Sequence, residues 1–450
     1  MSVENKQIAN LESLPVIRLL WRYFVPAFTG VIVNSLYNIV DRIFIGQGVG
    51  SLALAGLSAV YPIMLIMMGF GMLIGIGAGV RISINFGKKD FNRAEKVLGN
   101  AFVLMIIMAI LITILGFVIK EPMLRVFGAS AETSKYAHDY LDIILFGSIF
   151  NIVGFSLNNI IRSEGSAKVA MQSMFISAGV NVVLDPIFIF GFGWGVKGAA
   201  WATIISQFLL CVWVIYHFRG GRSIIKLKLK NFKLQKDIVF YILTIGFAPF
   251  AMQVSASMVQ AVFNSQLISH GGDIAVGAMG IINSVSMLLV MSVIAINMAA
   301  QPIWGFSYGA KLYERLRQTL KIALIAATGI SVFGFLIVQI FPCTIIKLFN
   351  AYDPELIAVG RQGIVIFFSL FPLVGFQIIV GNYFQSIGRA AKATVLSLLR
   401  QVIVLIPLLF ILPHWYGLVG VWLATPVSDI ISASINAVVL SKEWKRIKFL

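Results

Sequence analysis

The chain has 450 residues, of which 59% are hydrophobic and only 12% are charged, and its formal net charge is +17. This composition excludes an ordinary soluble domain, in which charged residues make up about a quarter of the chain. The positive charge indicates a nucleic-acid partner only if the basic residues gather on one folded surface, so their distribution along the chain decides its meaning.

Long apolar runs follow one another from residue 23 to residue 440. A helix needs about 20 apolar residues to cross about 30 Å of hydrocarbon, and the runs are continuous rather than alternating as in a membrane β-barrel. The polar N-terminus has no cleavable signal pattern, and the first run is long enough to remain as a span. The sequence therefore predicts an all-α integral membrane protein with twelve transmembrane helices, at 23–45, 53–80, 98–119, 138–162, 169–191, 197–218, 239–268, 274–304, 319–341, 356–386, 393–413 and 416–440.

The basic residues follow this topology. When the loops are assigned alternately to two sides, one side, which includes both termini, holds most of the 35 lysines and arginines. Cytoplasmic loops carry this excess, so we expect a multi-pass protein of the inner (plasma) membrane with both termini in the cytoplasm. The charge is thereby explained by the lipid bilayer, and no nucleic-acid partner is expected.

The second half of the chain repeats landmarks of the first at a separation of 222 or 223 positions. The matched pairs are Pro26 and Pro249, Gly87 and Gly309, Gly165 and Gly388, and the turns at 195–198 and 417–420. Two parallel copies of one bundle are typical of carriers that work by alternating access. We expect two six-helix lobes, 1–218 and 237–450, joined by a basic cytoplasmic linker at 219–236, and a monomer that contains its whole pathway.

Few predicted spans carry an ionisable residue at depth, where it is costly and therefore marks a candidate functional site. Asp41 is in the first span and Asp185 in the fifth, and Asn181 precedes Asp185 by four positions, on the same helix face. In a water-poor cavity, desolvation and mutual repulsion favour the protonated form of at least one member of such a pair, which could then take up a proton on one side and release it to the other. The alternative interpretation is that Asp41 is solvated near the end of its span and Asp185 precedes a proline turn.

Three motifs recur here in a family-specific order: Asp-x-x-Phe-Ile-Gly at 41–46, Leu-Asp-Pro at 184–186 and Gly-Ala-Ala-Trp-Ala-Thr at 198–203. With them the chain resembles, over essentially its whole length, prokaryotic transporters of the multidrug and toxic compound extrusion (MATE) family. The resemblance implies two six-helix lobes around a central cleft. It also implies export of amphipathic, often cationic compounds, driven by inward flow of H⁺ or Na⁺.

The resemblance further implies a cation site in the N-lobe, on the first, fourth, fifth and sixth spans. The matching positions hold Asp41, Tyr140, Asn181, Asp185 and Thr203. The two carboxylates would accept protons or coordinate Na⁺, and the other three side chains would supply hydrogen bonds or neutral oxygens. H⁺ is the favoured coupling ion. Oxygen ligands also suit a hard cation, so Na⁺ at Asp41, Asn181, Asp185 and Thr203 is the alternative.

Pro26 lies in the same predicted span as Asp41. A proline inside a helix frees a backbone carbonyl and permits bending. We therefore predict a hinge at Pro26 that is coupled to the cation site; the alternative is a static kink that serves packing.

The second lobe lacks carboxylates at the positions that answer to Asp41 and Asp185. Its seventh span carries Gln253, Gln260 and Asn264, which we interpret as polar residues of the transport cavity. This divergence favours cation coupling in the first lobe.

A second charged pair is expected between the eleventh and twelfth spans, where Arg400 and Asp429 lie. Because an unpaired charge at that depth is expensive, we predict an ion pair that clamps the two helices. A role in substrate binding or coupling is the alternative.

The spacing of Gly71, Gly75 and Gly79, with Gly77 beside them, places a strip of small residues on one predicted helix. No strand and no polar turn precede them, so close helix packing explains them better than a nucleotide-binding loop does.

Competing functions are distinguished by the same residues. A lipid-linked oligosaccharide flippase of the wider superfamily would need a basic cavity for pyrophosphate, whereas the core here is acidic. An intramembrane aspartyl protease and a channel lack supporting motifs. We expect no enzymatic activity, no cofactor and no transition-metal site.

Overall fold

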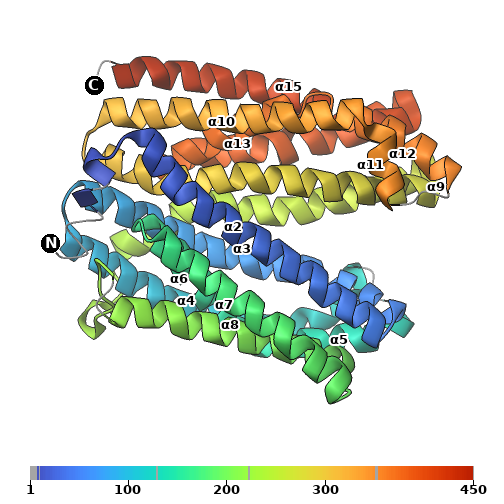
Figure 1. Ribbon diagram of the computed structural model, residues 1–450, viewed down its shortest axis with the longest axis horizontal. Coiled ribbons are helices and arrows are strands. Elements are labelled where there is room, and N and C mark those ends of the chain that lie inside the picture. The colour runs from blue at the N-terminus through green and yellow to red at the C-terminus, as the bar shows by residue number, and fades with distance from the viewer. Residues whose placement is uncertain (1–7, 10, 128–129, 221–222, 350–352, 449–450) are drawn as a thin grey trace. The chain divides into compact units, whose positions relative to one another are not determined.

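The computed structural model describes residues 8–9, 11–127, 130–220, 223–349 and 353–448, and these are almost entirely helical, with no strand among them (Figure 1). This confirms the predicted all-α class. The helices of the first half are α2 (Val16–Gly48), α3 (Ser51–Gly87), α4 (Phe91–Val126), α5 (Ala131–Phe146), α6 (Ser148–Ser163), α7 (Ala167–Pro186), the π-helix η1 (Ile187–Gly191), α8 (Gly195–Arg219) and the short 3-10 helix η2 (Leu229–Asn231).

The second half begins with α9 (Lys236–Gly309), in which Gly272 has non-helical backbone angles and divides two consecutive helices. It continues with α10 (Tyr313–Ile340), α11 (Pro342–Phe349), α12 (Pro354–Phe367), α13 (Pro372–Ser386), α14 (Ala390–Leu398), the π-helix η3 (Leu399–Leu405) and α15 (Ile406–Lys448). Gly417 interrupts α15 as Gly272 interrupts α9.

The described helices account for the twelve predicted spans. Nine are long and apolar enough to cross a membrane individually, and two bent pairs bring the number to eleven. The pairs are α5 with α6, which bend by 58°, and α12 with α13, which bend by 50°. The segment Ala390–Arg446 is 57 residues long and contains the break at Gly417, so at about 1.5 Å per residue it supplies two crossings.

The internal repeat is visible in the backbone. Left-handed residues recur at a separation of 222 or 223 positions, where each copy turns between the same two helices. The pairs are Gly50 and Gly272, Lys89 and Lys311, Gly165 and Gly388, and Gly195 and Gly417. Positive φ is rare outside glycine, so its recurrence at matched lysines indicates that both copies share one turn geometry.

The chain forms two compact units. The first consists of Met1–Gln253 with Gly305–Lys311, and the second of Val254–Trp304 with Leu312–Leu450. In the first unit α3 packs against α4, α5 and α6, and α2 packs along α7; in the second, α13 packs against α10, α14 and α15. A cluster of buried residues that includes Phe368 and Trp422 forms the core of the second unit.

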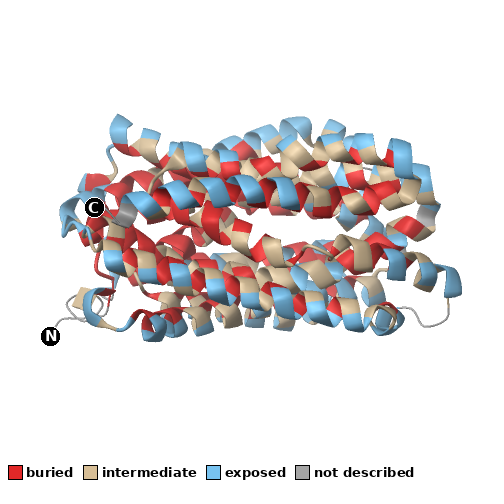
Figure 2. Cartoon of the chain, turned by 90° about the horizontal axis from the view of Figure 1, so that it is seen from above, coloured by how far each residue is buried: buried red, intermediate tan, exposed pale blue. Residues whose placement is uncertain are grey.

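Many large apolar residues are exposed rather than buried in these cores, and Figure 2 shows exposed positions along the outer helices. Val118 on α4 is 72% exposed and Phe240 on α9 is 71% exposed. Such a surface is unfavourable in water and is the surface that a helix presents to lipid. The exposure pattern therefore agrees with the membrane class.

The glycines of α3 are packing positions. A methyl group at Gly75 would lie 2.7 Å from the Cα of Ser156 on α6, and one at Gly77 would lie 2.1 Å from the carbonyl oxygen of Ile242 on α9. The α9 backbone approaches equally closely, because a methyl group at Gly246 would lie 1.7 Å from the carbonyl oxygen of Leu73. Bare backbones thus touch where α3 and the first part of α9 cross.

The basic linker is held against the first unit by carboxylate and amide side chains of α4 and by Glu164, which follows α6. Glu95 accepts from the ammonium group of Lys228 at 2.7 Å, and Asn100 accepts from the backbone N–H of Gln235 at 2.6 Å. The amide of Asn100 also donates to the carbonyl of Lys233 at 3.2 Å. These bonds fix the path of the linker from residue 223 to residue 235.

Candidate functional site

The two acidic residues predicted from the sequence come together inside the first unit. Asp41 lies on α2 and is 8% exposed, and Asp185 lies on α7 and is fully buried. The packing of α2 along α7 brings their carboxyl groups into direct interaction. Two carboxyls in contact and out of water are stable together only if they share a proton or a cation.

The other predicted residues of the cluster surround this pair. The amide of Asn181, one turn before Asp185 on α7, donates to the Oδ1 atom of Asp185 at 3.2 Å. Tyr140 on α5 and Thr203 on α8 are buried and interact through their hydroxyl groups, and Tyr140 also lies near Asp41. Four helices therefore contribute to one buried polar cluster.

Tyr37 belongs to this cluster and is absent from the sequence prediction. It lies one helical turn before Asp41 on α2, and its phenol lies close to both Asp41 and Asp185. The spacing of four residues was the signal that could have found it, because residues i and i+4 share a helix face.

Three buried oxygens of the cluster have no hydrogen-bond partner among the described residues. They are Oδ1 of Asp41, Oδ2 of Asp185 and Oδ1 of Asn181. A buried acceptor without a donor costs about 1–3 kcal/mol, and more when it is charged. Oxygens in this arrangement can bind a proton or a small hard cation, and both chemistries fit the donor set.

Pro26 lies within α2, about 22 Å along the helix axis from Asp41 at 1.5 Å per residue. It removes the helical hydrogen bond that the carbonyl of Arg22 would otherwise receive. The proline is therefore placed to bend α2 but makes no contact with the carboxyl pair.

The polar residues of the seventh span divide into two places. Gln253 is the last residue of the long segment of the first unit, and its side chain lies beside Gly69. Gln260 donates to Asn264 at 3.2 Å in the second unit and accepts from Asn283 at 3.4 Å, so Asn283 joins a pair that the sequence had suggested. All three amides of this second group are at least partly exposed.

Arg400 and Asp429 are in contact in the second unit. The Nε atom of Arg400 donates to Oδ1 of Asp429 at 2.6 Å, and Gln377 donates to the same carboxyl oxygen at 3.4 Å. Asp429 is 1% exposed, whereas a quarter of the Arg400 side chain is accessible. Arg400 also lies in the π-helix η3, and its carbonyl accepts from Ser428, so the two helices are joined twice.

A second buried polar cluster holds the start of the linker and was not predicted. Glu164, which follows α6, is fully buried; one carboxyl oxygen contacts Nε2 of His217 at 2.5 Å and the other accepts from Ser223 at 2.6 Å. Across the part of the chain that the structure covers, no group of three or more His, Cys, Asp or Glu side chains is placed to hold a metal ion.

Comparison with known proteins places these features in context. The MatE family model matches residues 26–187 and 248–411, which are the two copies of the repeat. The multidrug export protein MepA of Staphylococcus haemolyticus (strain JCSC1435) is 25% identical over 431 residues, which cover 96% of this chain and 94% of the relative. MepA of Staphylococcus aureus (strain NCTC 8325) is 26% identical over 419 residues, covering 93% and 92%.

Solved structures have the same fold. The MATE multidrug transporter DinF-BH, solved as a complex, is 38% identical, with a TM-score of 0.91 and 98% of both chains covered. A MOP superfamily transporter from Pyrococcus furiosus is 25% identical, with a TM-score of 0.92 over 98% of this chain and 99% of the other. For that transporter, the reverse polarity of the binding pocket suggests a different function.

Proposed function

The chain belongs to the MatE family, and from this premise we propose that it is an antiporter that exports amphipathic, often cationic compounds in exchange for a cation bound at Asp41 and Asp185. Relatives of similar length are multidrug export proteins, and the chain covers nearly all of each. Export of small organic compounds is therefore the activity, and the coupling ion and its site are the parts that this proposal adds.

One observation carries the coupling site: two buried carboxyls interact directly and leave buried oxygens without donors. A purely structural pair of acids would be hydrogen-bonded by bases or backbone N–H groups, since lone buried charges are strongly unfavourable. Arg42 lies close enough to act on Asp41 electrostatically, but it leaves these oxygens without a donor. A pair that needs a proton or cation to be stable is suited to binding and releasing one.

The same contact supplies a driving force for a conformational change. With a proton between the carboxyls, one donates to the other and α2 stays against α7. After the proton leaves, two like charges about 4 Å apart repel by about 4 kcal/mol at an effective dielectric constant of about 20. Repulsion of this size shifts a two-state equilibrium by about a thousandfold, and bending of α2 at Pro26 would relieve it.

Protons are favoured over Na⁺ because direct carboxyl–carboxyl contact is the geometry of a shared proton. An Na⁺ ion would have to separate the two carboxyls and draw in Asn181 and Thr203 as further oxygen ligands. With proton coupling, Tyr140 and Tyr37 would donate hydrogen bonds to the deprotonated carboxyl pair. With Na⁺ coupling, neither tyrosine would have a direct role.

For the second lobe we propose two roles. The at least partly exposed amides Gln260, Asn264 and Asn283 would face the transport cavity and hydrogen-bond to the exported compound. Arg400 and Asp429 would clamp η3 to α15. The lobes 1–218 and 237–450 would move as the alternating halves of a monomer in the inner (plasma) membrane, with both termini in the cytoplasm.

The test is ethidium efflux from cells that produce the wild-type chain, Asp185→Asn or Asp139→Asn at equal levels. Asp139 is the matched control, because its carboxylate lies on α5 next to Tyr140 but pairs with Lys197 at 3.3 Å, away from the cluster. We expect Asp185→Asn to abolish efflux and Asp139→Asn to retain it. Collapse of the proton gradient, but not of the Na⁺ gradient, should stop the wild type.

Retained efflux in Asp185→Asn would contradict the coupling site. Efflux that fails only when the Na⁺ gradient is collapsed would replace H⁺ by Na⁺ at the same site. Absence of efflux from the wild type would favour the flippase alternative, whose pyrophosphate cargo requires a cavity lined by basic side chains.

A further inference from the structure

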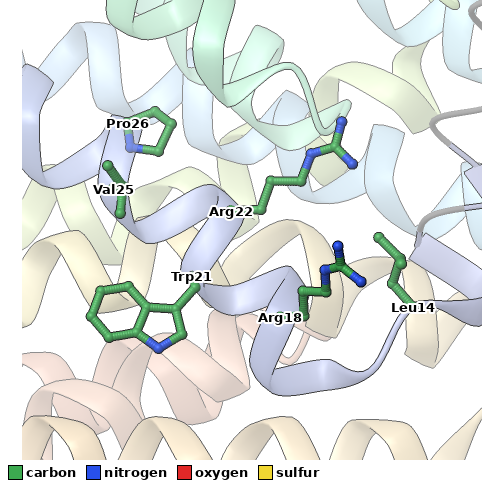
Figure 3. A pocket seen from close by; sticks show the side chains of 6 residues that line it. All are labelled: Leu14, Arg18, Trp21, Arg22, Val25 and Pro26. Atoms are coloured by element: carbon green, nitrogen blue, oxygen red, sulfur yellow. The ribbon is translucent and has the colours of Figure 1, made fainter.

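The first unit has two adjoining cavities near the N-terminal end of α2, away from the carboxyl cluster. One, of about 220 Å³, lies between α2 and the start of α7 and is lined by Arg22, Ser166 and Lys168 among others. The other is more open and is lined by Leu14, Arg18, Trp21, Arg22, Val25 and Pro26 (Figure 3). Arg22 and Pro26 line both, so the two cavities adjoin and together make up a depression at this end of α2.

Three basic side chains line this depression: Arg18 lines the more open cavity, Lys168 the smaller one, and Arg22 both. Arg18 and Arg22 are four residues apart on α2, and Figure 3 shows both guanidinium groups extending in the same direction from the helix. Both arginines and Lys168 are exposed, and no carboxylate of the described residues lies within 4.0 Å of any of them. Other acids of the first unit, such as Glu95 and Asp237, are paired with other bases.

Exposed apolar side chains form a rim beside these charges and indicate that the depression faces lipid. Trp21 is 60% exposed and points away from the two guanidinium groups, and Ile17 and Val25 are also exposed. Tryptophan at the end of a membrane-spanning helix typically lies at the level of the lipid headgroups. The arginines of the same helical turns then lie at the depth of lipid phosphates, with an apolar surface beside them for the acyl chains.

From this arrangement we propose that Arg18, Arg22 and Lys168 form a binding site for the phosphate group of an anionic phospholipid. Two guanidinium groups can each form paired hydrogen bonds with phosphate oxygens, and the lysine adds a third positive charge. A free phosphate ion would use the same three cations but gains nothing from Trp21 and Val25. The exposed apolar rim therefore favours a lipid as the occupant.

The position of the site gives it a consequence for transport. It joins α2 to the start of α7, and these are the helices that carry Asp41 and Asp185. A bound lipid bridges their ends next to Pro26, where α2 lacks a backbone hydrogen bond. Binding itself does not depend on the proposed coupling, so the two proposals fail independently.

The test is native mass spectrometry of the purified full chain with phosphatidylglycerol or phosphatidylcholine. The variant is Arg18→Gln with Arg22→Gln, and the matched control is Arg125→Gln with Arg361→Gln, which removes two exposed arginines elsewhere. A basic side chain near the membrane surface contributes about fivefold to the affinity for anionic lipid. We therefore expect about a 25-fold loss of phosphatidylglycerol binding in the variant and no comparable loss in the control.

Equal retention of phosphatidylglycerol by the variant and the wild type would overturn the proposal. A loss in the control as large as that in the variant would also overturn it, because the loss would then follow from net charge alone. Displacement of the lipid by inorganic phosphate at matched concentration would assign the site to a free anion instead. If the glutamine variant does not purify as a single species, Lys168→Gln provides the measurement, with an expected loss of about fivefold.

Discussion

Replacement of Gly246 by alanine tests the close crossing of α3 with the first part of α9. The new methyl group would lie 1.7 Å from the carbonyl oxygen of Leu73, whereas an ordinary contact begins at 3.4 Å. The clashing atom belongs to a helical backbone, so no side-chain rotation relieves the overlap, and the helices must separate locally by about the missing 1.7 Å.

The energetic cost follows from the geometry. Overpacking of a well-packed contact costs about 1–3 kcal/mol, and a clash with backbone belongs at the upper end of that range. A cost of about 3 kcal/mol changes the ratio of crossed to separated helices by about 150-fold. In an alternating-access cycle, α3 and the first part of α9 would separate and rejoin. Gly246→Ala should then hold the two helices in the separated arrangement.

The assay is a distance distribution between spin labels at residue 88, at the exposed end of α3, and residue 244, an exposed position of α9 two residues before Gly246, with Cys211 and Cys343 replaced. Gly246→Ala should move the distribution to longer distances and slow export. Gly329→Ala is the control, because a methyl group there has nothing within 4 Å. Unchanged distances and export in Gly246→Ala, equal to those of the control, would refute the reasoning.

Three further predictions concern polar groups. Tyr37→Phe should slow export about fivefold, since a hydroxyl hydrogen bond contributes about 1 kcal/mol, whereas Tyr216→Phe on the outer face of α8 should leave the export rate unchanged. Asp429→Asn should destabilise the chain by about 3 kcal/mol in thermal unfolding, and adding Arg400→Gln should recover most of the loss; no recovery would contradict the clamp. Glu164→Gln should accelerate tryptic cleavage of the linker several-fold, because two buried polar contacts are weakened; an unchanged rate would mean that other contacts hold it.

The spans were predictable because the thickness of the hydrocarbon layer fixes helix length and few charges interrupt the apolar runs. The predicted span at 138–162 corresponds to α5 and α6, yet nothing in its hydropathy indicated the 58° bend at Gly147. Such a bend depends on neighbouring helices: a methyl group at Gly147 would lie 2.4 Å from Ile204 on α8. The π-helices η1 and η3 were invisible for the same reason.

The carboxyl cluster was predictable in part. Asp41 and Asp185 stood out because a charge inside an apolar run is rare, and family motifs supplied their partners. Tyr37 did not stand out, since a tyrosine in a membrane helix is commonplace near its ends. Glu164 and His217 are 53 positions apart, and only the packing of α6 against α8 makes them neighbours.

The anchored linker has a mechanical consequence. Eighteen free residues reach about 60 Å, enough slack to let two attached bodies move without disturbing each other. Here Glu164, Glu95 and Asn100 remove that slack, and Arg93 contacts Asp237 at 2.8 Å in the first turn of α9. From residue 223 onward the junction between the repeats is thus bonded to the first unit, and a displacement of the start of α9 is transmitted to α4 through these bonds.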